Sequence, residues 1–162
     1  MKRQLFIVRH ALTHSGHHYI TDKERELKHE GVAQATALGT HLAASDYKID
    51  LIISSDAERA KSTAELIAST THYPSDRILY KQKLYSGTLT DLIHVVREIP
   101  NTAQQVLMVG HYPTILELHN HLMNEEKPGM ATCELSLAEI EVEWANIQLG
   151  SGTSILNFQS TF

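Results

Sequence analysis

Three short apolar runs, at residues 5–8, 51–53 and 106–109, constrain the fold of this chain most strongly. Apolar runs of this length without alternation predict strands that are covered on both faces. A segment with apolar residues at helical spacing follows each run, and amphipathic helices are expected at residues 30–44, 57–69, 89–99 and 113–123. Strands that alternate with helices indicate an α/β fold with a mostly parallel sheet.

Weaker patterns complete the predicted sheet. A short strand is expected at residues 77–80, and two closing strands are expected at residues 133–140 and 154–158, where they could pair antiparallel at one edge. The chain has 162 residues and no repeat or linker, which fits one domain on the prior of about 100–200 residues per domain. We therefore expect a three-layer sandwich over residues 1–162, with helices on both faces of the central sheet.

Charge and cysteine content exclude several classes of protein. The net charge is −5 and no stretch is strongly basic, which argues against nucleic acid as a partner. Cys133 is the only cysteine, so an intrachain disulfide and a cysteine zinc site are both excluded. No apolar run approaches the length of about 18 residues that a membrane helix needs, and the run at residues 5–8 is too short for a signal peptide. A soluble, cytoplasmic protein without a membrane partner is expected.

Polar side chains follow the three apolar runs where the predicted strands end. Arg9 and His10 follow the first run, Ser55 and then Arg59 follow the second, and His111 follows the third. In open α/β sheets, ligands bind beyond the carboxyl ends of the strands. These side chains, which lie far apart in sequence, are therefore expected to converge at one edge of the sheet.

The residue types at this edge suit phosphoryl chemistry. Ser55 is a candidate N-cap and Pro113 suits the first position of a helix, and helix N-termini attract phosphate. Arginine offers a planar fork that matches phosphate oxygens, and a neutral imidazole can attack phosphorus. Two arginines and a second histidine would offset the charge on the transferring group. This chemistry needs no metal and no cofactor.

Three segments resemble the motifs of the histidine phosphatase superfamily, which has the phosphoglycerate mutase-like fold. They are Val8-Arg9-His10-Ala11, Ser55-Asp56-Ala57-Glu58-Arg59-Ala60 and Val109-Gly110-His111-Tyr112-Pro113. The short chain is most similar to the SixA-type phosphohistidine phosphatases of that superfamily. Two features carry this closer similarity. One is the segment Asp22-Lys23-Glu24-Arg25-Glu26-Leu27 ahead of Gly31, and the other is the closing pattern of Trp144, Gly150 and Leu156-Asn157-Phe158.

The resemblance implies a role for each matching residue. His10 would be the phosphorylated nucleophile, Arg9 and Arg59 would bind the phosphoryl oxygens, and His111 would complete the pocket. Arg25 matches an arginine that lines the site in SixA-type members, although a solvated loop charge is the alternative for it. We expect Arg25 and Ser55 to bind the substrate.

The segment at residues 83–87 departs from the superfamily, because it has no carboxylate where phosphomonoesterases and mutases usually carry a proton donor. An alkyl phosphate needs such an acid, a contribution of about 10²–10⁴ in rate. Phosphohistidine needs it less, because imidazole has a pKa of about 6.5 and departs readily once protonated. Asp91 and Glu58 stay open as substitute donors.

The leading hypothesis is a phosphatase that hydrolyses phosphohistidine on a signalling or phosphotransfer protein through phospho-His10. A phosphatase of small phosphate esters or phosphoramidates is the second reading, and a non-catalytic module that binds phosphorylated partners is the third. The 11 histidines do not predict a metal site. His119 and His121 would point to different faces of a helix, and His17 and His18 are expected to be exposed in a loop.

Overall fold

The computed structural model describes residues 2–15 and 21–160, so His17 and His18 lie outside the described residues. Six strands form one sheet in the order β3-β2-β4-β1-β5-β6. The strands are β1 (Arg3–Arg9), β2 (Leu51–Ser54), β3 (Leu79–Tyr80), β4 (Gln105–Gly110), β5 (Leu135–Ile140) and β6 (Gly152–Phe158). The helices are α1 (His29–Ala43), α2 (Glu58–Thr71), α3 (Lys83–Ser86), α4 (Leu89–Arg97) and α5 (Thr114–Met123), with 3-10 turns η2 (Asp22–Glu24), η3 (Ser75–Arg77) and η4 (Trp144–Asn146).

The sheet is mostly parallel, as the sequence predicts. β1 and β2 both pair parallel with β4, and β3 pairs parallel with β2. β5 pairs antiparallel with both β1 and β6, so it alone runs against the other strands. The expected antiparallel pairing of the two closing strands at one edge is therefore confirmed.

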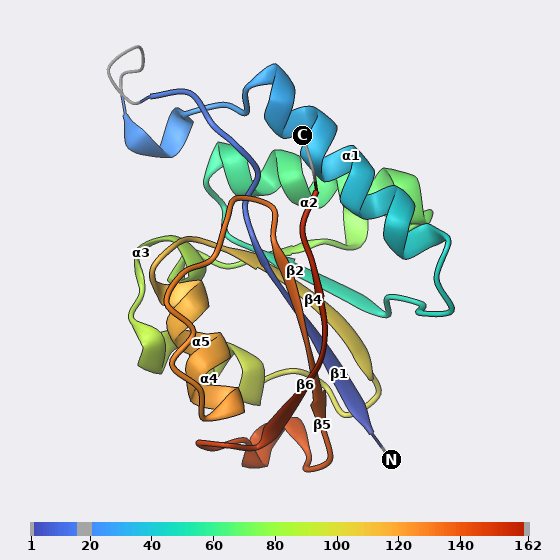
Figure 1. The fold of residues 1–162 in the computed structure, drawn as a ribbon, viewed down its shortest axis with the longest axis vertical. Coiled ribbons are helices and arrows are strands. Elements are labelled where there is room, and N and C mark those ends of the chain that lie inside the picture. Colours follow the sequence, from blue (N-terminus) through green and yellow to red (C-terminus); the bar gives the residue numbers. More distant parts are fainter. Residues whose placement is uncertain (1, 16–20, 161–162) are drawn as a thin grey trace.

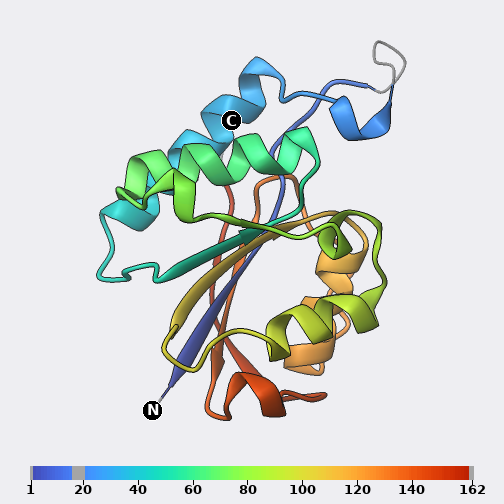
Figure 2. The same ribbon diagram turned by 180° about the vertical axis from the view of Figure 1, so that it is seen from behind.

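Helices cover both faces of the sheet, with α1 and α2 side by side on one face and α3, α4 and α5 on the other (Figures 1 and 2). Successive strand residues point to opposite faces, so β1 contributes to two cores. Phe6 and Val8 pack with α1 and α2, whereas Leu5 and Ile7 pack with α4 and α5. All four side chains are fully buried, which explains why the run at residues 5–8 is apolar without alternation. The three-layer sandwich is confirmed.

Some predicted boundaries are wrong. The strand expected at residues 77–80 is reduced to Leu79–Tyr80, because a 3-10 turn occupies Ser75–Arg77. Cys133 lies before β5 rather than in it: its backbone is left-handed, with a φ of 57°, and its N–H donates to the Arg9 and His10 carbonyls. Its side chain is nevertheless buried, as expected for a small core residue. The short helix α3 is absent from the sequence-based expectation.

The two predicted helix starts are also wrong by a few residues. Ala57 is the N-cap of α2, and the Ser55 hydroxyl instead accepts a hydrogen bond from the Ala57 N–H at 3.1 Å. Pro113 is the N-cap of α5 rather than its first residue, and it follows a cis peptide bond with Tyr112. Both segments form tight turns that bring the preceding side chains toward the sheet edge before the helix begins.

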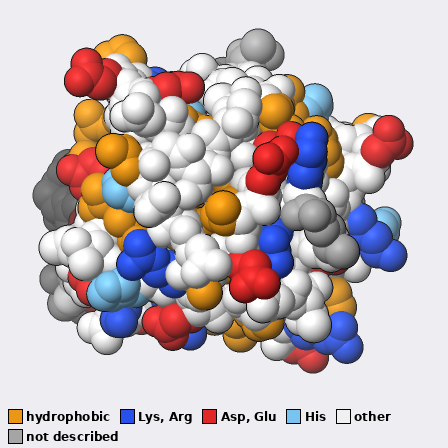
Figure 3. Space-filling model, turned by 90° about the horizontal axis from the view of Figure 1, so that it is seen from below, with side chains coloured by type: hydrophobic (Ala, Val, Ile, Leu, Met, Phe, Trp, Pro, Cys, Tyr) orange, Lys and Arg blue, Asp and Glu red, His pale blue; other side chains and the backbone are white. Residues whose placement is uncertain are grey.

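Charged side chains of both signs are interspersed on the face seen from below in Figure 3. The described side chains on that face therefore form no continuous basic patch of the kind that binds nucleic acid. Within residues 2–15 and 21–160, no helix is long and apolar enough to cross a membrane.

Candidate active site

The predicted residues meet at the carboxyl edge of the sheet. The His10 N–H donates to the Gly110 carbonyl at 3.0 Å, and the Ser55 N–H donates to the Val109 carbonyl at 3.0 Å. These backbone bonds extend the β1–β4 and β2–β4 pairings beyond the strand ends. As a result, the rings of His10 and His111 lie with their centroids 5.1 Å apart.

The His10 ring is held in one tautomer. Its Nδ1 lies 2.7 Å from the Ala11 carbonyl oxygen. A carbonyl can only accept, so Nδ1 carries the proton and Nε2 keeps its lone pair. The pKa of His10 is lowered from 6.5 to about 4, first by burial and then by the nearby Arg59 and Arg9 guanidinium groups. His10 is therefore neutral at pH 7, with a nucleophilic nitrogen.

Ser55 orients His111. The His111 Nε2 atom lies 2.8 Å from the Ser55 hydroxyl oxygen, which already accepts from the Ala57 N–H. The Ser55 hydroxyl is therefore expected to donate its proton to the His111 Nε2 atom, so the ring proton of His111 lies on Nδ1. That Nδ1 is buried and has no hydrogen-bond partner among the described residues. Burial, followed by the charges of His10 and Arg59, lowers the pKa of His111 to about 3.

Arg9 is held by neutral groups. Its Nη1 donates to the Met130 carbonyl at 2.7 Å, and its guanidinium lies 5.0 Å from the centroid of the Tyr112 ring. The turn that carries Met130 is braced by the buried Glu134, which accepts from the Ala131 N–H and pairs with the Lys127 ammonium group. Burial lowers the pKa of Arg9. The Arg9 Nε is buried without an acceptor in the described part of the chain.

Arg59 is held by a charged group, Asp22. Its Nη1 donates to the Asp22 main-chain carbonyl at 2.8 Å, and its Nη2 donates to the Asp22 Oδ2 at 3.0 Å. Arg59 lies in the first turn of α2, as the sequence predicts, and its side chain is 8% exposed. Like the Nε of Arg9, the Arg59 Nε is buried and has no acceptor within residues 2–15 and 21–160.

Arg25 joins the same cluster. Its Nη1 donates to the Asp22 Oδ1 at 2.8 Å, and its Nε donates to the His14 carbonyl at 2.8 Å. Its positive charge also contributes to lowering the pKa of His10. The structure therefore brings Arg25 to the site, with part of its guanidinium already occupied by protein acceptors.

Two residues at the site, Asp22 and Tyr85, were missed from the sequence. The Tyr85 hydroxyl donates to the Asp22 Oδ2 at 2.9 Å, and the Tyr85 ring lies 5.5 Å from the His111 ring, edge to face. Hydrogen bonds from Arg25, Tyr85 and Arg59 hold the pKa of the Asp22 carboxyl well below its usual range. The spacing of Asp22 three residues before Arg25 was a usable signal for an ion pair, but nothing local points to Tyr85.

Neither substitute proton donor lies free at this site. Both side-chain and backbone hydrogen bonds tie Asp91 to Thr88 in the capping box of α4, where the Thr88 N–H donates to the Asp91 Oδ2 at 2.9 Å. The Glu58 Oε1 accepts from the Ser62 hydroxyl at 3.5 Å on α2. Asp22 contacts the site arginines, but its lowered pKa makes it a poor acid.

No group of three or more histidine, cysteine or acidic side chains in the described chain is placed to hold a metal ion. His119 is buried, with its Nδ1 2.6 Å from the Ser136 hydroxyl and its Nε2 3.0 Å from the Glu125 carboxylate. Those two contacts fix His119 between α5 and β5, away from the candidate site.

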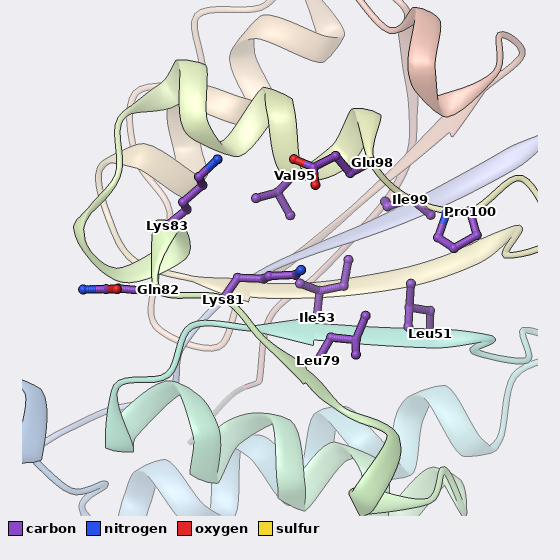
Figure 4. Close-up of a pocket in the computed structure, with 10 residues that line it drawn as sticks. All are labelled: Leu51, Ile53, Leu79, Lys81, Gln82, Lys83, Val95, Glu98, Ile99 and Pro100. Carbon is purple, nitrogen blue, oxygen red and sulfur yellow. The ribbon is translucent and has the colours of Figure 1, made fainter.

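A separate cavity of about 240 Å³ lies between the β2–β3 edge and α4 (Figure 4). Its lining is Leu51, Ile53, Leu79, Lys81, Gln82, Lys83, Val95, Glu98, Ile99 and Pro100. None of the predicted site residues is among them. The cavity is thus distinct from the cluster around His10, although α3 contributes Lys83 to the cavity and Tyr85 to the cluster.

Comparisons with known proteins agree with the resemblance. Residues 5–78 match the model of the histidine phosphatase superfamily (branch 1). The candidate phosphohistidine phosphatase SixA from Nakamurella multipartitia has a similar structure, with a TM-score of 0.83 at 22% identity over 100% of this chain and 98% of that one. A candidate SixA from Agrobacterium tumefaciens gives 0.84 at 21% identity over 98% of both chains. The protein histidine phosphatase SixA complexed with tungstate gives 0.82 at 21% identity over 96% of both.

A search of curated proteins finds no match. The sequence match lies in the part of the chain that holds Arg9, His10, Arg25, Ser55 and Arg59. The fold extends the similarity to nearly the whole chain. The chain is therefore similar to the histidine phosphatase superfamily in sequence over residues 5–78 and to the SixA structures in fold over nearly its whole length.

Proposed function

We propose that this protein is a phosphatase that hydrolyses phosphohistidine on a partner protein through a covalent phospho-His10 intermediate. One observation carries the proposal: His10 has an Nε2 lone pair available in a site with three buried donors that have no acceptor among the described residues. Those donors are the Nε atoms of Arg9 and Arg59 and the Nδ1 of His111. Buried donors without acceptors are costly, and an anion that accepts from them would remove that cost.

The first chemical step would transfer the phosphoryl group to His10. The Nε2 lone pair attacks phosphorus, a new P–N bond forms, and the P–N bond of the substrate breaks. The proton already on the substrate imidazolium lets that ring leave as neutral imidazole. The guanidinium groups of Arg9 and Arg59 and the His111 Nδ1–H would stabilise the charge on the transferring group.

In the second step, water attacks the phosphorus of phospho-His10. The P–N bond to Nε2 breaks, inorganic phosphate leaves, and His10 returns to its neutral form. The hydrogen bond from Nδ1 to the Ala11 carbonyl holds the ring in place through both steps. This sequence balances as phosphohistidine plus water giving histidine plus phosphate.

The acidic groups near His10 are poor proton donors, which favours phosphohistidine over alkyl phosphates as the substrate. The Tyr85 hydroxyl is the acidic group of the segment at residues 83–87, and burial raises its pKa. The Asp22 carboxyl is ionised because its pKa is lowered. A poor leaving group such as an alkoxide would therefore find no ready proton among the described residues, whereas phosphohistidine leaves as neutral imidazole with the proton that its ring already carries. The SixA structures, described as phosphohistidine phosphatases, support the same substrate class.

The test combines two substrates with a trapping experiment. The protein would be incubated with ³²P-labelled phosphohistidine protein and, separately, with p-nitrophenyl phosphate, and then examined for acid-labile, base-stable label. We expect label on the wild type, none on His10→Ala, and faster turnover of phosphohistidine. His94→Ala, which removes an exposed histidine on α4, is the matched control and should be labelled normally.

Three outcomes would redirect the proposal. Turnover of the ester alone would keep His10 as the nucleophile and move the substrate to small phosphate esters. Equal activity of the wild type and His10→Ala would remove the covalent mechanism, and binding of phosphoprotein without label or turnover would make the chain a binding module.

A further inference from the structure

Asp22 pairs with two of the three arginines at the site, Arg25 and Arg59. Its Oδ1 accepts from the Arg25 Nη1 at 2.8 Å, and its Oδ2 accepts from the Arg59 Nη2 at 3.0 Å. Its Oδ2 also accepts from the Tyr85 hydroxyl at 2.9 Å. Carboxylates and phosphoryl groups bind the guanidinium fork through the same geometry. Asp22 therefore uses donors of the kind that a bound phosphoryl group would use.

The charge balance of the site depends on this carboxylate. Arg9, Arg25 and Arg59 all act on the His10 ring as positive charges. Asp22 acts on the neighbouring His111 ring as a negative charge, and the His111 and His10 ring centroids are 5.1 Å apart. Its side chain is 51% exposed, and the carboxylate thus stands between buried Arg59 and solvent. A phosphate dianion that binds beside His10 would feel its repulsion.

We propose that Asp22 limits the affinity of the site for phosphate: it neutralises one of three guanidinium charges and holds donors of Arg25 and Arg59 away from the bound group. The inference rests on the proposed phosphatase function, in which inorganic phosphate is the product. Weak binding of phosphate keeps product release fast and leaves the site open for the next phosphoprotein. Asp22 is thus a residue that tunes affinity rather than a catalytic residue.

Asp22→Asn is the direct test, because it removes the charge and keeps an oxygen that can accept from one arginine. The Arg59 Nη1 contact survives, since its acceptor is the main-chain carbonyl of residue 22. We expect inorganic phosphate to bind the full-length variant about tenfold more tightly, from the Coulomb energy of removing one charge near a dianion in a partly solvated site. Isothermal titration calorimetry with inorganic phosphate measures this directly.

Asp56→Asn is the matched control. Asp56 is also an aspartate in an ion pair, with Lys23 at 2.9 Å, but it has no contact with Arg25 or Arg59 among the described residues. We expect its phosphate affinity to stay within about twofold of the wild type, because more distant surface charges are screened. Asp22→Ala, which removes the carboxylate without adding an amide, should tighten phosphate binding in the same direction as Asp22→Asn.

The kinetic signature separates this inference from the proposed function. With phosphohistidine protein as substrate, inorganic phosphate should inhibit Asp22→Asn at about tenfold lower concentration than the wild type. Unchanged or weaker phosphate binding in both Asp22 variants would overturn the inference and leave Asp22 as a support for the arginines. Absence of phospho-His10 in the wild type would instead defeat the proposed function, whatever the affinities for phosphate.

Discussion

Arg9 and Arg59, the two arginines expected to bind the phosphoryl group, are held in different ways. Arg9 is anchored by a neutral carbonyl, that of Met130, and by the face of the Tyr112 ring. Arg59 is anchored by the ionised carboxylate and the main-chain carbonyl of Asp22. On the first side the hydrogen-bond acceptor is uncharged and Glu134 acts on the guanidinium only through space, whereas on the second side a carboxylate pairs directly with the guanidinium.

The supports of these two arginines also differ in exposure. Glu134, which braces the turn behind Arg9, is 5% exposed and belongs to the folded core of the β5 end. The Asp22 side chain lies on a short surface turn and is about half exposed. Buried supports fix geometry, whereas an exposed carboxylate can adjust charge without disturbing the core. We infer that the Arg9 side sets the position of the phosphoryl group and that the Arg59 side sets how strongly it is held.

The largest expected effect comes from removing either arginine. Arg59→Ala should lower kcat/KM by about 10³, and Arg9→Ala by about 10², because in the proposed mechanism each removes a donor to the transferring group. The loss is greater for Arg59→Ala because it also deprives the Asp22 carboxylate of a partner and leaves it repelling the substrate. Steady-state kinetics with phosphohistidine protein give both values.

A double variant checks that explanation. Adding Asp22→Asn to Arg59→Ala should restore about tenfold of the lost kcat/KM, whereas adding it to Arg9→Ala should restore less. Equal losses in the two single variants, with no recovery in either double variant, would show that the two sides do not differ in charge balance.

The pKa of His10 gives a second comparison of the two sides. Burial is the main cause of its low value of about 4, and Arg59 contributes more than Arg9. Arg59→Gln should therefore raise the pKa of His10, and Arg9→Gln should raise it by a smaller amount. Titration of the His10 ring by NMR in each variant measures both shifts, and a larger shift in Arg9→Gln would reverse the assignment of the two sides.

The same low pKa makes stability depend on pH. Between about 6.5 and 4, unfolded His10 takes up a proton that folded His10 does not, so the unfolded state binds more protons. The free energy of unfolding should consequently fall as pH falls through this window, by about 1.4 kcal/mol per pH unit for this histidine. Urea unfolding at several pH values gives the slope. His10→Gln should reduce it, and an unchanged slope would mean that the pKa of His10 is the same in the folded and unfolded protein.

The sheet and the main helices were predictable because their signals are local. Apolar runs such as residues 5–8 are short and unbroken where the strand is covered on both faces, and the helices repeat apolar residues at a fixed spacing. The convergence of His10, Ser55, Arg59 and His111 followed from one topological rule about strand ends. The structure places all four at that edge, although their catalytic and binding roles stay predictions.

The parts that escaped prediction depend on contacts between distant segments. The Asp22–Arg59 pair joins residues 37 positions apart, and the Tyr85–Asp22 bond joins residues 63 positions apart. The helix α3 has four residues, too few for a periodic pattern. Ser55 was expected to cap a helix because serine is common there, but the tertiary contact with His111 uses its hydroxyl instead. The sequence therefore predicted the place of Ser55 at the sheet edge correctly, but not the bond between its hydroxyl and His111.

The smallest expected effect is that of Tyr85→Phe. It tests whether the Tyr85 hydroxyl only supports Asp22 beside Arg59 or also donates a proton. The change removes the hydroxyl bond to the Asp22 Oδ2 and keeps the ring against His111, while both arginines still hold the carboxylate. The loss of one hydrogen bond to an exposed carboxylate should change kcat/KM by less than about fivefold. Kinetics with phosphohistidine protein and p-nitrophenyl phosphate, measured side by side, give the test. A loss of a hundredfold or more confined to the ester would mean that the Tyr85 hydroxyl delivers the proton to the leaving group. In that case the Arg59 side would contribute an acid as well as a charge.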